Sequence, residues 1–298
     1  MNNPTLLILA AGMGSRYGGL KVDDPIGPHG QTIINYSIHD ASQAGFSKFF
    51  FVIRPEIDDS FRRLVHERLG GTQIEVHFIY QKVADLPRDF RVPPGRIKPW
   101  GTTHAILSAA GTIHEPFGVI NVDEFYGADS YRSLANHLRA GTSDQAMVSF
   151  VLRNTLPEFE PVARAVCHVN HEGFLEQINE LKSVEKENSH IISTDKDGLE
   201  TVLHGDELVS MNMWGFTPPV FDMFAGQFKH FLERSRIDEN AECCIPDTIS
   251  ELVKDGKLRV KVLHCADSWF GLTYRADHTH AAANIMQLTK AGYYPQRL

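Results

Sequence analysis

Four residues near the N-terminus have the types and spacing of a phosphate-binding segment. Gly12 and Gly14 follow an apolar run, and Arg16 and Lys21 follow the glycines. Because glycine has no Cβ, backbone N–H groups beside it can approach phosphate oxygens closely. An arginine can form two parallel hydrogen bonds to phosphate, whereas a lysine supplies a compact charge. The pattern therefore favours an anionic, phosphorylated ligand, and the alternative is a plain strand-to-helix turn with two solvated cations.

This segment fits neither of two common phosphate-binding templates. The pattern G-x-G-x-x-G of dinucleotide-binding folds requires a glycine where Tyr17 stands. The P-loop pattern, counted from Gly14, reaches Gly19 but then requires a lysine at Leu20, and Lys21 comes one residue late. We therefore expect a third geometry for phosphate binding.

Two acidic residues follow another apolar run. Asp123 ends this run, GVINVDEF, where a carboxylate is costly unless its charge is compensated. Mg²⁺ held by one or two carboxylates and by substrate phosphates is one compensation. A helix N-cap or a salt-bridged strand end is the alternative. Glu124 points the other way along the strand, so we expect it to be structural.

An amide side chain ends a third apolar run, IEVHFIYQ. Gln81 can form two hydrogen bonds with the edge of a nucleobase, and so can the backbone amides of Gly101 and Thr102. The alternative is a buried glutamine that backbone groups satisfy. Residues 85–100 carry four cations and four prolines. That stretch is either a lid that closes on a triphosphate or a solvated loop.

Predicted strands and helices alternate along the first half of the chain, which is typical of an α/β fold. The predicted strands are 6–10, 48–55, 74–81 and 118–127, and the predicted helices are 32–45, 58–71 and 103–113. We expect a Rossmann-like, mixed but mainly parallel sheet with helices on both faces. Such sheets bind ligands at the carboxyl ends of their strands, where the candidate residues fall.

After about residue 145 the pattern changes to that of an antiparallel β extension. Residues 165–180 alternate around the turn NHEG, as a hairpin does. Further strands are predicted at 146–154, 208–218 and 258–265, and helices at 220–235, 245–257 and 273–292. We predict a nucleotide-binding half, 1–145, and an acceptor-binding half, 146–298, joined as one globular unit.

The composition restricts the partners. A formal net charge of −8 over 298 residues gives no basic field for nucleic acid or an anionic membrane. The four cysteines lack metal-ligand spacing and are expected to be reduced thiols. Together with the lack of a leader or a membrane-spanning run, this predicts a cytoplasmic protein. A homo-oligomer remains open.

The same residues carry a family resemblance over nearly the whole chain. LAAGMGSR followed by Lys21 resembles the signature of sugar-phosphate nucleotidylyltransferases, L-A-G-G-x-G-T/S-R and then P-K. WGTTHAI, NVDEF, EGFLEQINELK, SMNMWGF and SWFGLTYRADH resemble later segments of that family in the same order. The resemblance implies Mg²⁺-dependent transfer of a nucleoside monophosphate from an NTP to a phosphorylated acceptor, such as a sugar 1-phosphate, with release of pyrophosphate.

The resemblance also implies a role for each matching residue. The catalytic residues would be Arg16, Lys21 and Asp123, with Asp123 as the metal ligand. The nucleotide would be bound by Ala11, Gly12, Gly14, Ser15, Gln81, Gly101 and Thr102. The acceptor would be bound by Glu180, Asn212 and Trp214.

Three positions depart from the family pattern. Leu20 replaces the proline before the lysine, Leu181 interrupts the E-K-P segment, and Gly271 replaces an aspartate that often provides a second metal ligand. The third departure keeps open a catalytically silent nucleotide-sugar-binding or regulatory subunit. A Rossmann oxidoreductase is disfavoured by Tyr17 and by Arg54, which stands where such folds carry an acid.

Overall fold

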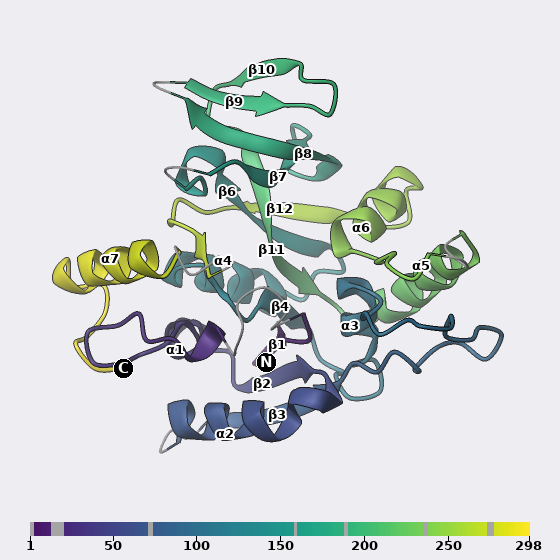
Figure 1. Ribbon diagram of the computed structural model, residues 1–298, viewed down its shortest axis with the longest axis horizontal. Helices are drawn as coiled ribbons and strands as arrows, with labels where there is room; N and C mark the ends of the chain where they lie inside the picture. The colour runs from purple at the N-terminus through teal and green to yellow at the C-terminus, as the bar shows by residue number, and fades with distance from the viewer. Residues whose placement is uncertain are drawn as a thin grey trace.

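We analysed a computed structural model that describes residues 3–12, 21–70, 74–157, 160–187, 190–234, 238–272 and 277–298. Within these ranges one eleven-stranded sheet runs through the molecule in the order β10-β9-β8-β7-β11-β4-β1-β2-β3 (Figure 1). The other two of the eleven strands branch from this order, because β6 pairs with β11 and β12 pairs with β6.

The lower part of the sheet in Figure 1 is parallel. Its strands are β1 (Thr5–Leu9), β2 (Lys48–Ile53), β3 (Glu75–Tyr80) and β4 (Phe117–Asn121). Their runs are apolar because both faces of the sheet are covered. Leu6 and Ile8 face one apolar layer, and Leu7 and Leu9 face the other.

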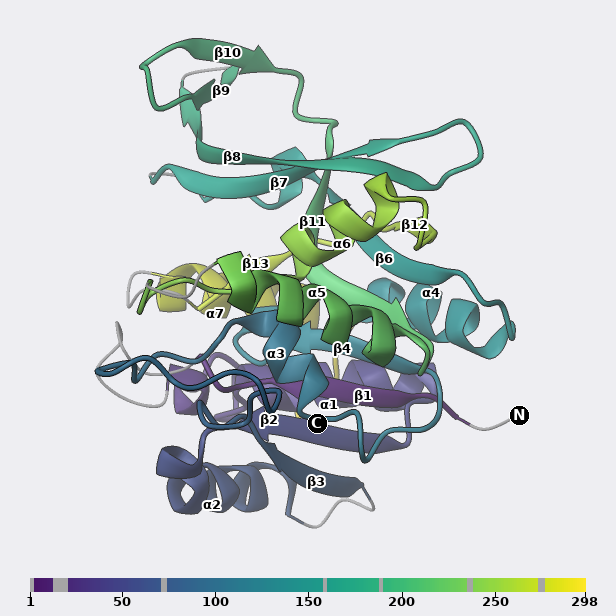
Figure 2. The same ribbon diagram turned by 90° about the vertical axis from the view of Figure 1, so that its right-hand side faces the viewer.

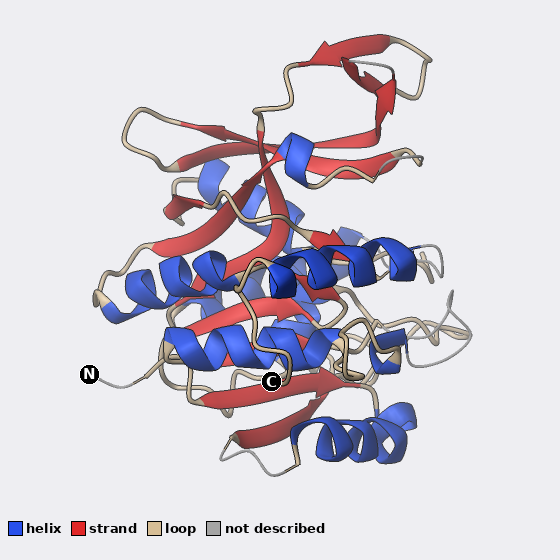
Figure 3. Ribbon diagram, turned by 90° about the vertical axis from the view of Figure 1, so that its left-hand side faces the viewer, coloured by secondary structure: helices blue, strands red, loops and turns tan. Residues whose placement is uncertain are grey.

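Helices cover both faces of the parallel strands. One layer contains α1 (Ile33–Ala44), α2 (Asp58–Leu69), α4 (Ala128–Arg139) and α7 (Asp277–Lys290). The other contains α3 (Thr102–Leu107), α5 (Val220–Arg234) and α6 (Ile245–Lys254). Figure 2 has α3, α5 and α6 in front of the sheet, and Figure 3 shows the opposite side. Among the described residues, no helix combines the length and the apolar character needed to cross a membrane.

The upper part of the sheet is antiparallel and extends beyond the helical layers, except where α6 packs against β8 (Figures 1 and 2). It consists of β7 (Val162–Val169), β8 (Leu175–Glu187), β9 (His190–Thr194) and β10 (Glu200–Leu203). Gly173 in the β7–β8 turn has φ +79°, a left-handed conformation that glycine adopts without strain. The hairpin predicted around NHEG is confirmed.

One strand joins the two parts. β11 (Leu208–Phe216) pairs with β7 through Val209 and Ser210, and with β4 from Trp214 onward. On its other side it pairs with β6 (Gln145–Val151), which pairs in turn with β12 (Val260–His264). The register with β6 shifts between Ser210 and Trp214, where β11 changes neighbours. The parallel and antiparallel parts of the sheet are therefore joined through one continuous strand.

Most predicted elements are confirmed, one predicted strand is corrected, and two strands were missed. Gly45 ends α1 in a left-handed conformation with φ +94°, as its position predicted. The run 118–127 is not a single strand, because β4 ends at Asn121 and a turn precedes β5 (Glu124–Phe125). β5 pairs with β13 (Phe270–Gly271) in a separate two-stranded sheet. The strands β9 and β10 were missed, because their residues are mixed in polarity.

Candidate active site

Three of the candidate residues meet at the carboxyl edge of the parallel strands. In the sheet register Leu9 of β1 pairs with Val52 of β2 and Asn121 of β4, and Ile53 pairs with Tyr80 of β3. Backbone hydrogen bonds continue this register past the strand ends, from Ala10 N to Val52 O (2.8 Å) and from Gln81 N to Ile53 O (2.9 Å). On the β4 side, Val122 N donates to Leu9 O at 3.1 Å. Asp123, Ala11 and Gln81 therefore follow β4, β1 and β3 at the same edge.

Gln81 is held by two groups of the segment that begins α3. Its side chain is 3% exposed. Its Nε2 donates to Gly101 O at 2.9 Å and lies 3.2 Å from His104 Nδ1. A carbonyl oxygen can only accept, so the nitrogen of the Gln81 amide must face Gly101. The sequence left open whether groups of the protein form hydrogen bonds with the Gln81 side chain. The structure shows that they do so with its N–H groups.

His104 fixes the second hydrogen bond of Gln81. Its Nε2 lies 2.9 Å from the backbone oxygen of Asp85, so Nε2 carries a hydrogen and donates. Burial lowers the pKa of His104 below its usual value, which favours the neutral ring. Nδ1 of that ring accepts from Gln81. Both N–H donors of the Gln81 amide are then occupied, and its oxygen is the group that can accept from an N–H of a base. Of the pair of hydrogen bonds to a base that we expected from this side chain, only the acceptor stays available, and contact with a base stays a prediction.

Gly101 has a structural reason to be glycine. Its φ is +97°, and a Cβ would lie 2.5 Å from the backbone oxygen of Cys243. Thr103 N donates to Cys243 O at 3.0 Å, and Cys243 N donates to Trp100 O at 2.8 Å. Thr102 Oγ1 accepts from Ile245 N at 2.9 Å. The start of α3 is thus bound to the segment that leads into α6, and a base contact through the amides of Gly101 and Thr102 stays a prediction.

The glycine-rich segment is described only at its two ends. Ala11 is buried, Gly12 is exposed, and no described atom lies within 4 Å of a Cβ placed on Gly12. Gly14, Ser15 and Arg16 lie outside the described residues. The backbone of Lys21 begins a short 3-10 helix, η1 (Lys21–Asp23), and its side chain is outside the described part.

Asp123 lies in the turn between β4 and β5 and not at the end of a strand. It is half-buried, and its backbone oxygen accepts from Leu272 N at 2.9 Å. Gly271, which replaces the expected aspartate, pairs with Glu124 beside it. Gly271 and Leu272 therefore lie beside the turn that carries Asp123, and Gly271 offers no carboxylate there. No cluster of three or more potential metal ligands occurs among the His, Cys, Asp and Glu side chains that the structure describes.

Glu124 is structural, as the sequence predicted. Its carboxylate accepts hydrogen bonds from Asn121 Nδ2 (2.7 Å), Tyr126 OH (2.7 Å) and Trp269 Nε1 (3.0 Å). Burial, and to a lesser extent the charge of Asp123, raises the pKa of Glu124 above its usual value. The three donors therefore give this carboxylate a structural role in the turn that carries Asp123.

Asn212 lies where β11 changes neighbours. Its φ is +63°, the only positive value at a non-glycine residue among those described. Its Nδ2 lies 3.4 Å from Asn121 Oδ1, and its Oδ1 accepts from Trp214 Nε1 at 2.9 Å. A left-handed backbone at asparagine is strained by about 1 kcal/mol, and such strain is often found at functional sites. Asn212 thus connects β11 to the end of β4.

The two other proposed acceptor residues lie differently. Trp214 is completely buried and stacks on Phe216, so it has no surface to offer an acceptor and supports Asn212 instead. This corrects the direct contact expected for Trp214. Glu180 is exposed on β8 and pairs with Ala165 of β7, which pairs with Ser210 of β11. Its role as an acceptor contact stays a prediction.

The proline-rich stretch 85–100 is anchored at its C-terminal end. The guanidinium of Arg96 lies 3.5 Å above the ring of Trp100. It donates to five backbone oxygens, which belong to Lys98, Pro99, Asp238, Glu239 and Ala241. Arg96 therefore fastens this stretch to the segment before α6 and is not a cation of a mobile lid.

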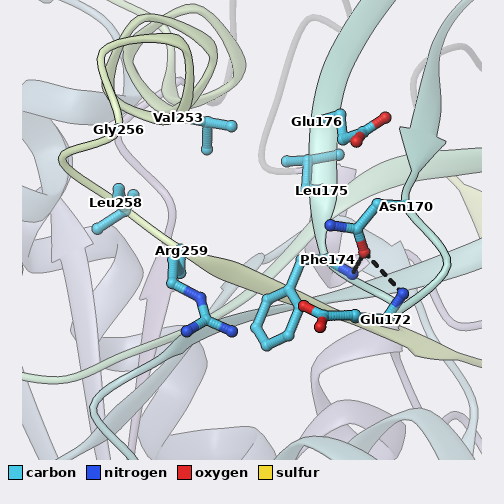
Figure 4. Close-up of a pocket in the computed structure, with 9 residues that line it drawn as sticks. All are labelled: Asn170, Glu172, Phe174, Leu175, Glu176, Val253, Gly256, Leu258 and Arg259. Carbon is cyan, nitrogen blue, oxygen red and sulfur yellow. Dashed lines mark hydrogen bonds between the residues drawn. The ribbon is translucent and has the colours of Figure 1, made fainter.

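A hollow of about 410 Å³ lies elsewhere, between the β7–β8 turn and the connection from α6 to β12 (Figure 4). Asn170 Oδ1 accepts from the backbone N–H groups of Glu172 and Phe174, and the guanidinium of Arg259 lies 4.1 Å from the Phe174 ring. None of the candidate residues lines this hollow. It forms no part of the site.

Two residues of the site were not singled out from the sequence. Asn121 connects Asn212 to Glu124, and His104 orients Gln81. Asn121 is the last residue of β4, two positions before Asp123, so its nearness in sequence to that candidate was the available signal. His104 had no comparable signal, since its partners come from separate segments.

A model of the MobA-like NTP transferase domain matches residues 6–196. No curated protein sequence matches the chain. Among solved structures, the inositol-1-phosphate CTP transferase from T. maritima has a similar fold, with a TM-score of 0.62 and 14% identity. The match covers 96% of this chain and 97% of that one.

The family model covers more than half of the chain. The protein therefore belongs to the MobA-like NTP transferase family, and its class is that of a nucleotidyltransferase. The resemblance to nucleotidylyltransferases and the expected fold are both confirmed.

Proposed function

We propose that this protein is a Mg²⁺-dependent nucleotidylyltransferase that transfers a nucleoside monophosphate from an NTP to a phosphorylated small molecule, a sugar 1-phosphate or a related polyol phosphate. The supporting observation is the order of groups along one edge of the sheet. Gln81 lies beside the start of α3, the glycine-rich segment leaves β1, and Asp123 follows β4 next to Asn212 and Asn121. A nucleotide needs a base contact, a phosphate segment and an acceptor in this order.

In this reaction a phosphate oxygen of the acceptor attacks the α-phosphorus of the NTP. The bond from that phosphorus to the β-phosphate oxygen breaks, and pyrophosphate leaves. The protein aligns two polyanions and neutralises their charge. We assign the leaving pyrophosphate to Arg16 and the α-phosphate to Lys21, with the amides at Gly12 and Gly14 around the phosphates.

The residues at this edge fit Mg²⁺ of the kind that substrates help to bind. Mg²⁺ is usually held by one or two carboxylates together with substrate phosphates and water. Asp123 supplies one carboxylate, and the oxygens of Glu124 are occupied by three donors. When bound, Mg²⁺ would neutralise the phosphate charge that develops during transfer. With Gly271 in place of an aspartate, we expect weak metal binding unless the nucleotide is present.

The acceptor class is supported by the chemistry of the junction in β11. Asn212 and Asn121 present amide groups, which pair with hydroxyl groups as donor or acceptor. The T. maritima structure described above is named for a transferase that uses CTP and inositol 1-phosphate, so both its substrates are of the classes proposed here.

The test is a matrix of substrates. The wild-type protein is incubated with Mg²⁺, each of ATP, CTP, GTP, UTP and dTTP, and a panel of sugar 1-phosphates that also contains inositol 1-phosphate. Pyrophosphate release and the mass of the nucleoside-diphosphate product are measured. We expect turnover with at least one pair. NTP binding without pyrophosphate release from any pair would instead indicate the silent subunit, for which Gly271 is the supporting residue.

A further inference from the structure

A cation other than Arg16 and Lys21 belongs to the carboxyl edge of the parallel strands, where the nucleotide is proposed to bind. It follows a different strand from the glycine-rich segment. Arg54 follows β2 directly. Since Leu9 pairs with Val52 and Ile53 pairs with Tyr80, continuation of the register sets Arg54 beside Ala11 on one side and Gln81 on the other. The hydrogen bonds of Ala10 and Gln81 to β2 support this continuation.

The side chain of Arg54 projects on the same face of the sheet as that of Gln81. Its backbone is still extended, with φ −91° and ψ 148°, so the alternation of the strand holds through this residue. Phe50 and Val52 face the layer of α3, α5 and α6, whereas Phe51 and Ile53 face the other layer. Arg54 has the parity of Val52, and Gln81 contacts α3. Both side chains therefore belong to the α3 face.

The position of Arg54 falls between two parts of the proposed nucleotide site. Neighbouring strands of a sheet are about 4.8 Å apart, so its Cα lies about one strand spacing from Gln81 and one from Ala11. Gln81 is the proposed contact of the base, and the glycine-rich segment begins at Ala11. If the base of the nucleotide lies at Gln81 and its phosphates reach the segment that begins at Ala11, its ribose and first phosphates lie beside Arg54. Its two immediate neighbours in the row, Ala11 and Gln81, are uncharged.

We infer that Arg54 binds the triphosphate of the nucleotide from the β2 side of the proposed site. This inference rests on the proposed function, because it takes an NTP as the ligand. A guanidinium suits the role, since it stays charged and donates in parallel to two phosphate oxygens. In a protein of net charge −8, attraction of a polyanion depends on such local cations.

The experiment compares two ligands that differ only in phosphate. Equilibrium dissociation constants are measured for the NTP that wild type binds best, by calorimetry, and for its nucleoside, by ligand-observed NMR at millimolar concentration. The proteins are wild type, Arg54→Gln and Arg54→Lys. We expect Arg54→Gln to weaken NTP binding by about 10–100-fold and nucleoside binding by less than about threefold. Arg54→Lys should fall between wild type and Arg54→Gln for the NTP.

The matched control is Arg63→Gln. Arg63 is exposed on α2, which packs on the other face of the sheet. Arg63→Gln therefore removes the same charge as Arg54→Gln, but at a position that does not face the proposed site. Its NTP affinity should equal that of wild type. A purely structural Arg54 would give equal losses for NTP and nucleoside, which would overturn the inference.

The remaining outcomes are also decisive. A folded Arg54→Gln protein with the NTP affinity of wild type would refute the role of Arg54 and leave the proposed function intact. Wild type that binds none of the five NTPs would refute both. If Arg54→Gln does not fold, Arg54→Met, which keeps the aliphatic stem, takes its place, and failure of both to fold would assign Arg54 to the fold alone.

Discussion

The proposed base side and the proposed acceptor side of this site lie on one sheet, but they are held by different means. Gln81 is positioned by hydrogen bonds of 2.9 and 3.2 Å to groups that are themselves anchored, Gly101 through Cys243 and His104 through Asp85. Asn212 accepts a hydrogen bond of 2.9 Å from the buried Trp214 of its own strand, lies 3.4 Å from Asn121 and has a left-handed backbone. The proposed base contact is therefore held by segments distant in sequence, whereas the proposed acceptor residue is held mainly within its own strand and carries backbone strain.

The largest effect is expected where the two sides meet. Asp123→Asn should lower turnover by about 10²–10³-fold while the fold persists, because the one carboxylate proposed for Mg²⁺ is lost. Asp59→Asn, at an exposed position of α2, is the control. Pyrophosphate release is measured with and without excess chelator. Unimpaired turnover in Asp123→Asn, or full wild-type activity in chelator, would contradict the metal assignment.

Lys21→Ala should also lower turnover by about 10²–10³-fold, but NTP affinity should fall less. The reason is that charge at the α-phosphate grows in the transition state, while the segment amides and Arg16 still hold the other phosphates. Lys21→Arg should not rescue fully, since a planar fork does not replace a compact ammonium. Turnover and NTP dissociation constants are compared in the same protein, and equal losses in both would reduce Lys21 to a binding residue.

A change on the base side should leave the acceptor side untouched. Gln81→Glu puts a carboxylate oxygen against the Gly101 oxygen, where the amide nitrogen now donates at 2.9 Å. We expect NTP affinity to fall by about 10–100-fold, with the KM for the acceptor unchanged. Gln287→Glu, on the exposed face of α7, makes the same exchange far from the site. A similar rise in both substrate constants would show that the two sides are coupled.

A change on the acceptor side separates strain from chemistry. Asn212→Gly and Asn212→Ala both remove the amide and should raise the KM for the acceptor by up to about tenfold, without affecting NTP affinity. They should differ in stability, because only glycine accepts φ +63° without cost, so the alanine protein should be less stable by about 1 kcal/mol. Urea denaturation and acceptor kinetics measure the two effects. Equal stability would show that Asn212 is not strained.

Asp40 on α1 is a buried acid outside the proposed substrate contacts, so we expect its substitution to leave the substrate constants unchanged. Asp40 on α1 accepts from Tyr294 OH at 2.6 Å, and burial, reinforced by Asp267, raises its pKa to about 7. In the unfolded chain it would titrate near pH 4. Between these values the folded protein binds the extra proton, so the free energy of unfolding should fall as pH rises from about 4 to 7 and then level off.

The measurement for Asp40 is urea denaturation at pH 5 and pH 8. Wild type should lose on the order of 1–2 kcal/mol between them because of this group, and Asp40→Asn should lose correspondingly less. The same pH dependence in both proteins would assign the loss to other groups.

The sequence predicted the parts of this fold that short-range patterns encode. Apolar runs marked β1 to β3, and glycine positions marked the ends of α1 and the β7–β8 turn. The orientation of the Gln81 side-chain amide could not be predicted from the sequence. It depends on His104 and on the carbonyl of Gly101, which lies twenty residues away in sequence. The depth of Trp214 could not be read either, since β4, β6 and β11 bury it together.

The path of β11 has a consequence for how such proteins diversify. One strand carries Ser210, paired to the extension, and Trp214, paired to the nucleotide edge, with Asn212 between them. Because β11 lies within residues 146–298 but pairs with β4 of residues 1–145, exchange of the second half would also replace a strand beside the proposed nucleotide edge. Changes in the proposed acceptor site should disturb the fold least as single substitutions near the junction, or as a longer β9–β10 hairpin at the free end of the sheet.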